Sequence, residues 1–98
     1  MTRLIEMTAQ GSIAVLTMNA AENRHNPEFL SAFNQHLDQI EADQAIKSVI
    51  LTSSSEKNWS LGIDLAWMSQ PTNTAEMISV FMSDLTKLLK RIVTFPMP

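Results

Sequence analysis

The stretch SVILTSSSEKNWSLGIDLAWM, residues 48–68, decides the fold because it places three kinds of segment in a fixed order. Residues 48–52 form a short β-branched run, which predicts a central strand. Residues 53–58 are polar and predict a loop, and residues 64–68 can form a short helix. Gly62 stands between that loop and that helix, and it is one of only two glycines in the chain. Its position raises the question of whether it only turns the backbone or helps to build a site.

Ahead of this stretch the sequence predicts a β-hairpin. Residues 3–8 alternate in side-chain character, residues 10–12 read as a turn around a glycine, and residues 13–18 form a second β-rich segment. The second strand is apolar on nearly both faces, so we expect it to be covered on both sides.

A helix is predicted between the hairpin and the strand at residues 48–52. Asn26 can serve as its N-cap and Pro27 fits its first position, and we expect the helix to end at about Asp43. One apolar stripe recurs at helical spacing, and His36 lies off it on the polar side. The stripe consists of Phe29, Leu30, Phe33, Leu37 and Ile40. The order strand, strand, helix, strand predicts a β-β-α-β unit whose helix crosses over the sheet.

A second long helix is predicted from Ala75 to near Val93. Asn73 followed by Glu76 resembles a loose capping box at its start. Residues 95–98 read FPMP and cannot continue it, because each proline disfavours helix in the residue before it.

The composition excludes several classes of protein. The chain has 98 residues, which suits one domain over residues 1–98, and its 45% apolar and 17% charged residues are typical of a globular chain. The net charge of −3, without clustered Lys or Arg, argues against nucleic-acid binding. The chain has no cysteine, and His25 and His36 lack ligand-like spacing, so no metal site is expected. No apolar run is long enough for a membrane span, and residues 1–4 lack a signal-peptide core, which favours the cytoplasm.

Three stretches carry a resemblance to a known family. They are IAVLTMN at residues 13–19, the stretch at residues 48–68, and KLLKRIVTFPMP at residues 87–98. Together they resemble the N-terminal part of the crotonase family, the enoyl-CoA hydratases and isomerases. The resemblance implies an α/β fold of the crotonase-like (ClpP/crotonase) class, a spiral of β-β-α units, with this chain as the N-terminal portion of the core domain.

The resemblance also implies a chemistry for the glycine. Family members hold an acyl-CoA thioester, and two backbone N–H groups meet the thioester oxygen as it gains negative charge in an enolate. The first of these donors is the residue after the motif glycine, here Ile63, while Gly62 lets the backbone approach the ligand. One such donor contributes roughly 3–4 kcal/mol to lowering a barrier. Asp64 is then placed to cap the short helix that follows.

The remaining site residues follow from the same resemblance. Backbone around Ser60 and Leu61 would border the adenine pocket, and Asn26 and Leu65 would complete the substrate-binding set. The loop near Arg24 would lie beside CoA, where Arg24 could pair with a phosphate. No separate cofactor is implied, because coenzyme A is part of the substrate. The implied assembly is a homo-oligomer, a trimer or a pair of trimers.

The sequence departs from the family pattern in several places. The loop NAAENRHNPEFL is shorter than usual, and its ENR-x-NP form leans toward isomerase-like members. Trp59 and Leu61 stand where Phe and Ala are common. The family's second oxyanion donor and its glutamates follow the Pro-x-Pro and have no counterpart in this sequence. We therefore assign no catalytic acid or base, and expect the chain alone to be inactive and to bind CoA thioesters weakly or not at all.

Other interpretations remain open at this point. A STAS-like protein-binding module has a similar order of elements, although Ser53, Ser54 and Ser55 follow the strand too directly for its helix start. A chain that only associates with other chains is a third possibility, favoured by apolar helix faces. The site residues also have ordinary explanations: a turn glycine at 62, a solvated arginine at 24, a loop histidine at 25, packing tryptophans at 59 and 67, and carboxylates without a visible partner at 22 and 28.

Overall fold

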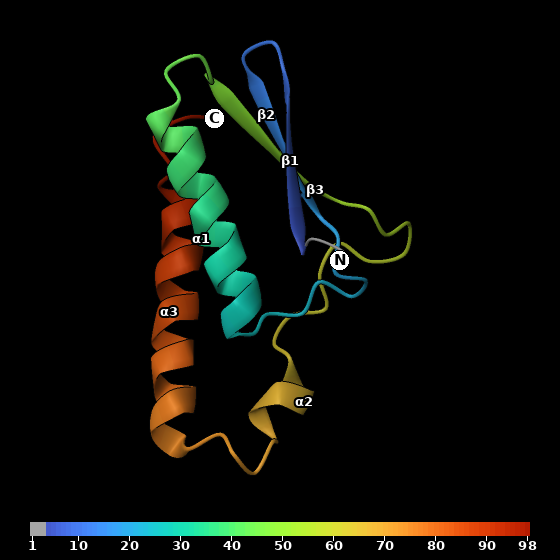
Figure 1. Cartoon of the computed structure of the whole chain (residues 1–98), viewed down its shortest axis with the longest axis vertical. Helices are drawn as coiled ribbons and strands as arrows, with labels where there is room; N and C mark the ends of the chain where they lie inside the picture. The colour runs from blue at the N-terminus through green and yellow to red at the C-terminus, as the bar shows by residue number, and fades with distance from the viewer. Residues whose placement is uncertain (1–3) are drawn as a thin grey trace.

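The computed structural model describes residues 4–98 and contains a three-stranded sheet in the order β1-β2-β3. The strands are β1 (Ile5–Gln10), β2 (Ile13–Met18) and β3 (Ser48–Ser53). β1 pairs with β2 in antiparallel fashion, and β2 pairs with β3 in parallel (Figure 1). The predicted β-β-α-β unit is therefore confirmed. Residue 3, the predicted start of the first strand, lies outside the described residues.

The hairpin between β1 and β2 closes over two residues. Gln10 pairs with Ile13, so Gly11 and Ser12 form the connection. Gly11 has a φ of +60°, a backbone conformation that a two-residue hairpin needs and that glycine adopts without strain. The predicted glycine turn is confirmed, and β1 runs two residues beyond its predicted end.

Two expectations about the sheet are wrong. β2, and not β3, is the middle strand, so residues 48–53 lie at an edge of the sheet. One face of β2 is buried through Ala14, Leu16 and Met18, whereas its other face is only half-buried. The reason is that α1 (Pro27–Ala42) and α3 (Ala75–Val93) both lie on the same side of the sheet (Figure 1). In residues 4–98 the apolar outer face of β2 has no second helical layer.

The first helix begins and ends as the sequence predicts. The side chain of Asn26 accepts the N–H of Phe29 at 2.9 Å, Pro27 occupies the first turn, and Asp43 is the C-cap. The predicted apolar stripe is the buried face of α1. His36 was expected on the polar side, but it is half-buried, and its Nε2 lies 3.0 Å from the carbonyl oxygen of Ile5. The histidine thus joins α1 to β1.

The second long helix has the predicted length and a different cap. Thr74, rather than Asn73, caps α3, because its hydroxyl accepts the N–H of Met77 at 3.1 Å. The side chain of Asn73 instead donates to the carbonyl of Trp67, in the short helix α2 (Leu65–Met68). The buried residues of α3 are Phe81, Leu85 and Leu88.

The segment after α3 turns back onto the sheet. Phe95 and Met97 pack against the core, and the carbonyl of Pro98 accepts the N–H of Val49 at 2.8 Å. Near the end of α3, Arg91 binds Asp38 and Glu41 of α1, each at 2.8 Å. These ion pairs therefore join α1 and α3 near the C-terminal end of each helix. None of the helices in residues 4–98 has the length and apolar character that crossing a bilayer requires.

Candidate functional site

Two loops meet at one edge of the sheet. β2 and β3 are parallel, so their carboxyl ends lie at the same edge, and the loops at residues 19–26 and 54–64 leave from it (Figure 1). Main-chain hydrogen bonds join them: the N–H of Leu61 donates to Glu22 at 2.9 Å, and the N–H of His25 donates to Gly62 at 2.7 Å. The parallel connection of the strands thus explains why residues about 40 positions apart form one corner.

Asn23 is the buried link between these loops. It is fully buried and has a φ of +52°, in the left-handed region that asparagine tolerates better than most residues. Its Oδ1 accepts the N–H of Ala20 at 2.9 Å. Its Nδ2 donates to Ser53 Oγ and to the carbonyl of Trp59, both at 2.8 Å. Asn23 is not among the residues that the sequence predicts for the site; the signal that could have indicated it is an asparagine in a short loop between a strand and a helix.

Gly62 and Ile63 form the centre of the corner. Gly62 has a φ of +86°, and a Cβ built on it would meet no atom within 4 Å, so backbone conformation and not crowding within the chain explains the glycine. Ile63 and His25 form an isolated parallel bridge. Its two hydrogen bonds use the carbonyl of Gly62 and the N–H of Asp64, so the N–H of Ile63 points to the opposite side. Within residues 4–98 that N–H has no hydrogen-bond acceptor and belongs to no regular ladder.

Asp64 and Asn26 start two helices from one contact. Asp64 Oδ1 accepts the N–H of Trp67 at 3.0 Å, so Asp64 caps α2 as the sequence predicts. Its Oδ2 accepts a hydrogen bond from Asn26 Nδ2 at 3.0 Å, while Asn26 itself caps α1. The hydrogen bond from Asn26, followed by that from Trp67, lowers the pKa of Asp64. The carboxylate therefore stays ionised at the junction of the two helix starts.

A cavity of about 210 Å³ lies at this corner, and Arg24, Asn26 and Asp64 are among its lining residues. Glu22 also lines it and binds Arg24 Nε at 3.0 Å, which raises the pKa of Arg24. The expectation that Glu22 has no partner is therefore wrong. The structure brings these three predicted site residues together around one space, and the charged groups in its wall are one cation, Arg24, and three carboxylates, Glu22, Glu28 and Asp64.

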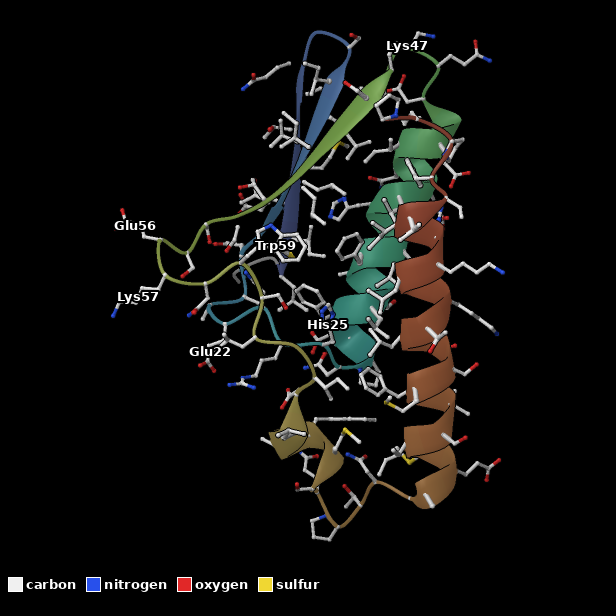
Figure 2. The ribbon with its side chains drawn as sticks, turned by 180° about the vertical axis from the view of Figure 1, so that it is seen from behind. Glu22, His25, Lys47, Glu56, Lys57 and Trp59 are labelled. Atoms are coloured by element: carbon white, nitrogen blue, oxygen red, sulfur yellow. The ribbon has the colours of Figure 1, made fainter. Side chains whose placement is uncertain are left out.

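The predicted site residues Ser60, Leu61 and Leu65 lie in or next to the second loop and do not line the cavity. Ser60 lies within the joined loops, where its Oγ donates to the carbonyl of Asn23 at 2.8 Å. Leu61 and Leu65 are exposed, with 42% and 64% of their surface accessible. Trp59 is also exposed and lies at the rim of the corner (Figure 2).

His25 is a half-buried loop residue near the start of α1 (Figure 2). Its ring meets the edge of Phe29 at a centroid distance of 5.3 Å. Burial lowers the pKa of His25 below its usual value of 6.5. In the part of the chain that the structure describes, no group of three or more His, Asp or Glu side chains is placed to hold a metal ion.

The layered sheet and helices make this an α/β chain, and solved proteins of the crotonase fold superpose on it with TM-scores of 0.85 and 0.86, over 98% and 97% of this chain. Comparison with known proteins agrees: the profile of the enoyl-CoA hydratase/isomerase family matches residues 8–98. The chain belongs to the enoyl-CoA hydratase/isomerase family, and it has the fold of the N-terminal portion of a crotonase.

Individual relatives are similar over most of this chain. It is 35% identical to a Thermus thermophilus protein named "Putative enoyl-CoA hydratase", over 91% of this chain and 36% of the relative. It is 37% identical to the mitochondrial enoyl-CoA delta isomerase 1 of Rattus norvegicus, over 74% of this chain and 26% of the relative. A solved enoyl-CoA hydratase/isomerase family protein from Pseudomonas syringae superposes with a TM-score of 0.81 at 33% identity, over 97% of this chain and 39% of its own. The chain thus spans between 26% and 39% of the length of these relatives, and the STAS-like alternative finds no support among them.

Proposed function

We propose that this chain supplies the CoA-binding portion of an acyl-CoA enzyme and one oxyanion-hole amide, the N–H of Ile63. The observation that carries the proposal is the bridge between His25 and Ile63. It holds the segment on both sides of Ile63 by hydrogen bonds of 2.7 and 2.9 Å while leaving the Ile63 N–H itself without an acceptor in residues 4–98. A fixed donor that is not used in the fold is what electrostatic stabilisation of a developing oxyanion requires.

The names of the relatives include a hydratase and an isomerase. We therefore propose the step that both chemistries share. As the acyl-CoA thioester is attacked or loses a proton, negative charge gathers on its oxygen, and the Ile63 N–H donates to that oxygen. The acid or base that moves the proton is not assigned to any residue of this chain.

Arg24 is the proposed contact for the CoA end of the substrate. Its ion pair with Glu22 uses Nε, and the terminal guanidinium nitrogens make no hydrogen bond within residues 4–98. A guanidinium with free terminal N–H groups suits bidentate binding of a phosphate. Ser60, Leu61, Asn26 and Leu65 complete the proposed substrate-binding surface. The homo-oligomer and the cytoplasmic location implied by the sequence stay predictions.

The experiment that tests this proposal is a titration followed by NMR at individual amides. The ¹⁵N-labelled protein is titrated to millimolar concentration with crotonyl-CoA and, separately, with free CoA. We expect crotonyl-CoA to shift the Ile63 amide downfield, because a new acceptor engages it, and both ligands to shift Arg24. An Ile63 amide that does not move with crotonyl-CoA, while other amides do, would contradict the oxyanion role.

The two glycines of the chain provide a matched pair of variants. Both have positive φ and open space at the Cβ position, so Gly62→Ala and Gly11→Ala introduce a similar strain of about 1–2 kcal/mol. Only Gly62→Ala displaces the Ile63 amide, and we expect it to abolish the crotonyl-CoA shift at Ile63. In an active form of the protein, loss of one donor predicts a fall in turnover of about 10²–10³-fold. If both substitutions changed the crotonyl-CoA shift at Ile63 equally, Gly62 would have only a structural role in the turn.

A further inference from the structure

His25 holds the Gly62–Ile63–Asp64 segment through its backbone and approaches the adjoining Ser60 with its ring. Its N–H donates to Gly62 at 2.7 Å, and its carbonyl accepts from Asp64 at 2.9 Å. Its ring nitrogen Nε2 lies 3.4 Å from Ser60 Oγ. Ser60 Oγ in turn accepts the N–H of Gly62 at 3.2 Å. The ring and the backbone of one histidine therefore act on the same turn from two directions.

Hydrogen-bond accounting assigns the tautomer of His25. Ser60 has one hydroxyl proton, and it donates that proton to the carbonyl of Asn23 at 2.8 Å. Its remaining lone pairs accept the N–H of Gly62 and face His25 Nε2. Nε2 must therefore carry a proton and donate it. The neutral ring then has a bare lone pair at Nδ1, which is buried and has no hydrogen-bond partner in residues 4–98.

We propose that His25 is a positioning residue for the Ile63 amide, acting through Ser60 and only as the neutral ring protonated at Nε2. This inference rests on the proposed function for its effect on catalysis, whereas the tautomer and the contact with Ser60 are properties of the fold. The ring fixes the Ser60 hydroxyl, the hydroxyl fixes the Gly62 N–H, and the next amide along the chain is that of Ile63.

Protonation of the ring works against this arrangement. It places an N–H at the buried Nδ1, where the described residues offer no acceptor. The facing side chain of α1 is that of Phe29, which is uncharged. Among the charged groups of the two loops, Arg24 binds Glu22 and Asp64 binds Asn26, while Glu56 and Lys57 lie at the tip of the second loop, away from the ring (Figure 2). A charged ring must therefore turn toward water, which withdraws Nε2 from Ser60.

The direction of the pH effect follows from the pKa of His25. Burial lowers this pKa below 6.5, so the ring is neutral at pH 7 and the turn is held. The unfolded chain takes up the proton at higher pH than the folded chain does. Stability from this group is therefore complete above the unfolded pKa and falls as the pH drops below 6.5 toward the folded value.

Two variants and a matched control separate positioning from general damage. His25→Phe keeps the ring against Phe29 but removes the donor, and His25→Gln keeps a donor near the Nε2 position without titrating. The control is His36→Gln, because His36 is also half-buried, also has an Nδ1 without a partner in residues 4–98, and contacts the carbonyl of Ile5 in β1 rather than either loop. We expect His25→Phe to speed hydrogen exchange of the Gly62 amide about tenfold, the equivalent of one lost hydrogen bond. His25→Gln and His36→Gln should leave that rate within about threefold of the parent value.

Ring-nitrogen NMR and turnover complete the test. The spectrum of the parent should show His25 protonated at Nε2 at pH 7, and a ring protonated at Nδ1 would overturn the inference. In an active form of the protein, we expect turnover of the parent to fall as the pH drops below 6.5, because the charged ring releases Ser60. His25→Gln should remove the part of that fall that comes from the ring, and His25→Phe should lower turnover at every pH. Unchanged Gly62 exchange in His25→Phe would also overturn it. If the amide and ring signals behave as expected but no thioester is bound or turned over, the proposed function fails and the positioning contact stands.

Discussion

At the residue scale, Asn23 joins the two loops at the corner through three side-chain hydrogen bonds. It is fully buried, and its backbone has a left-handed conformation. Its side chain forms hydrogen bonds with Ala20, Ser53 and Trp59. Buried polar side chains are stable only when their donors and acceptors are satisfied. Asn23 meets this condition while it joins the end of one strand to the loop of another.

Substitution of Asn23 should therefore destabilise the protein by two separable effects. Asn23→Gly keeps the left-handed backbone and loses the hydrogen bonds, which we expect to cost about 2 kcal/mol of unfolding free energy. Asn23→Ala adds the left-handed strain of a Cβ and should cost about 3–4 kcal/mol. Urea denaturation measures both, with the half-buried Asn58→Ala as the control, expected within about 0.5 kcal/mol of the parent. Equal stability of Asn23→Gly and Asn58→Ala would contradict the role of the amide.

At the element scale, short polar side chains set where each helix begins. Asn26, Asp64 and Thr74 each accept a backbone N–H from three residues further along the chain. Such a cap satisfies one of the unpaired donors at a helix start. The first two caps also contact each other, so the starts of α1 and α2 are fixed relative to one another.

The cap of α3 gives a direct test, because its predicted and observed positions differ by one residue. Thr74→Ala should lower the free energy of unfolding by about 1 kcal/mol, since it removes the acceptor for the Met77 N–H. Thr72→Ala, in the exposed turn before it, should change stability by less than about 0.5 kcal/mol. Thermal unfolding followed by circular dichroism makes the comparison. Similar losses in the two variants would mean that the hydroxyl of Thr74 does not cap the helix.

At the scale of the whole molecule, the helices and the sheet form two layers that are open on their outer sides. The radius of gyration is 14.3 Å, above the value of about 13 Å expected for a compact domain of this size. Apolar side chains remain exposed on β3 and on α3, among them Ile50, Leu89 and Val93. The fold thus buries one continuous core and leaves further apolar surface around it.

Two neighbouring leucines of α3 test this arrangement. Leu88 is 1% exposed and Leu89 is 50% exposed, although both fit the apolar period of the sequence. We expect Leu88→Ala to cost about 2–5 kcal/mol of unfolding free energy, because it opens a cavity in the core. Leu89→Ala should cost less than about 1 kcal/mol in the 98-residue chain. If denaturation gave the reverse order, α3 would have to be rotated from the orientation described.

Much of this protein was determined by its sequence alone. Strand alternation, helical spacing, the caps Asn26 and Asp64 and the hairpin glycine placed every element close to its observed bounds, because each of these signals acts between near neighbours in the chain. The family was indicated by the resemblance of three sequence stretches, and the family profile confirms it over residues 8–98. Only the tertiary structure decided that β3 lies at the edge, that His36 faces the sheet, and that Asn23 and His25 hold the segment around Ile63. Those outcomes depend on contacts between residues about 30 to 40 positions apart. Side-chain periodicity reflects only near neighbours in the chain, so it does not predict which distant segment a loop contacts.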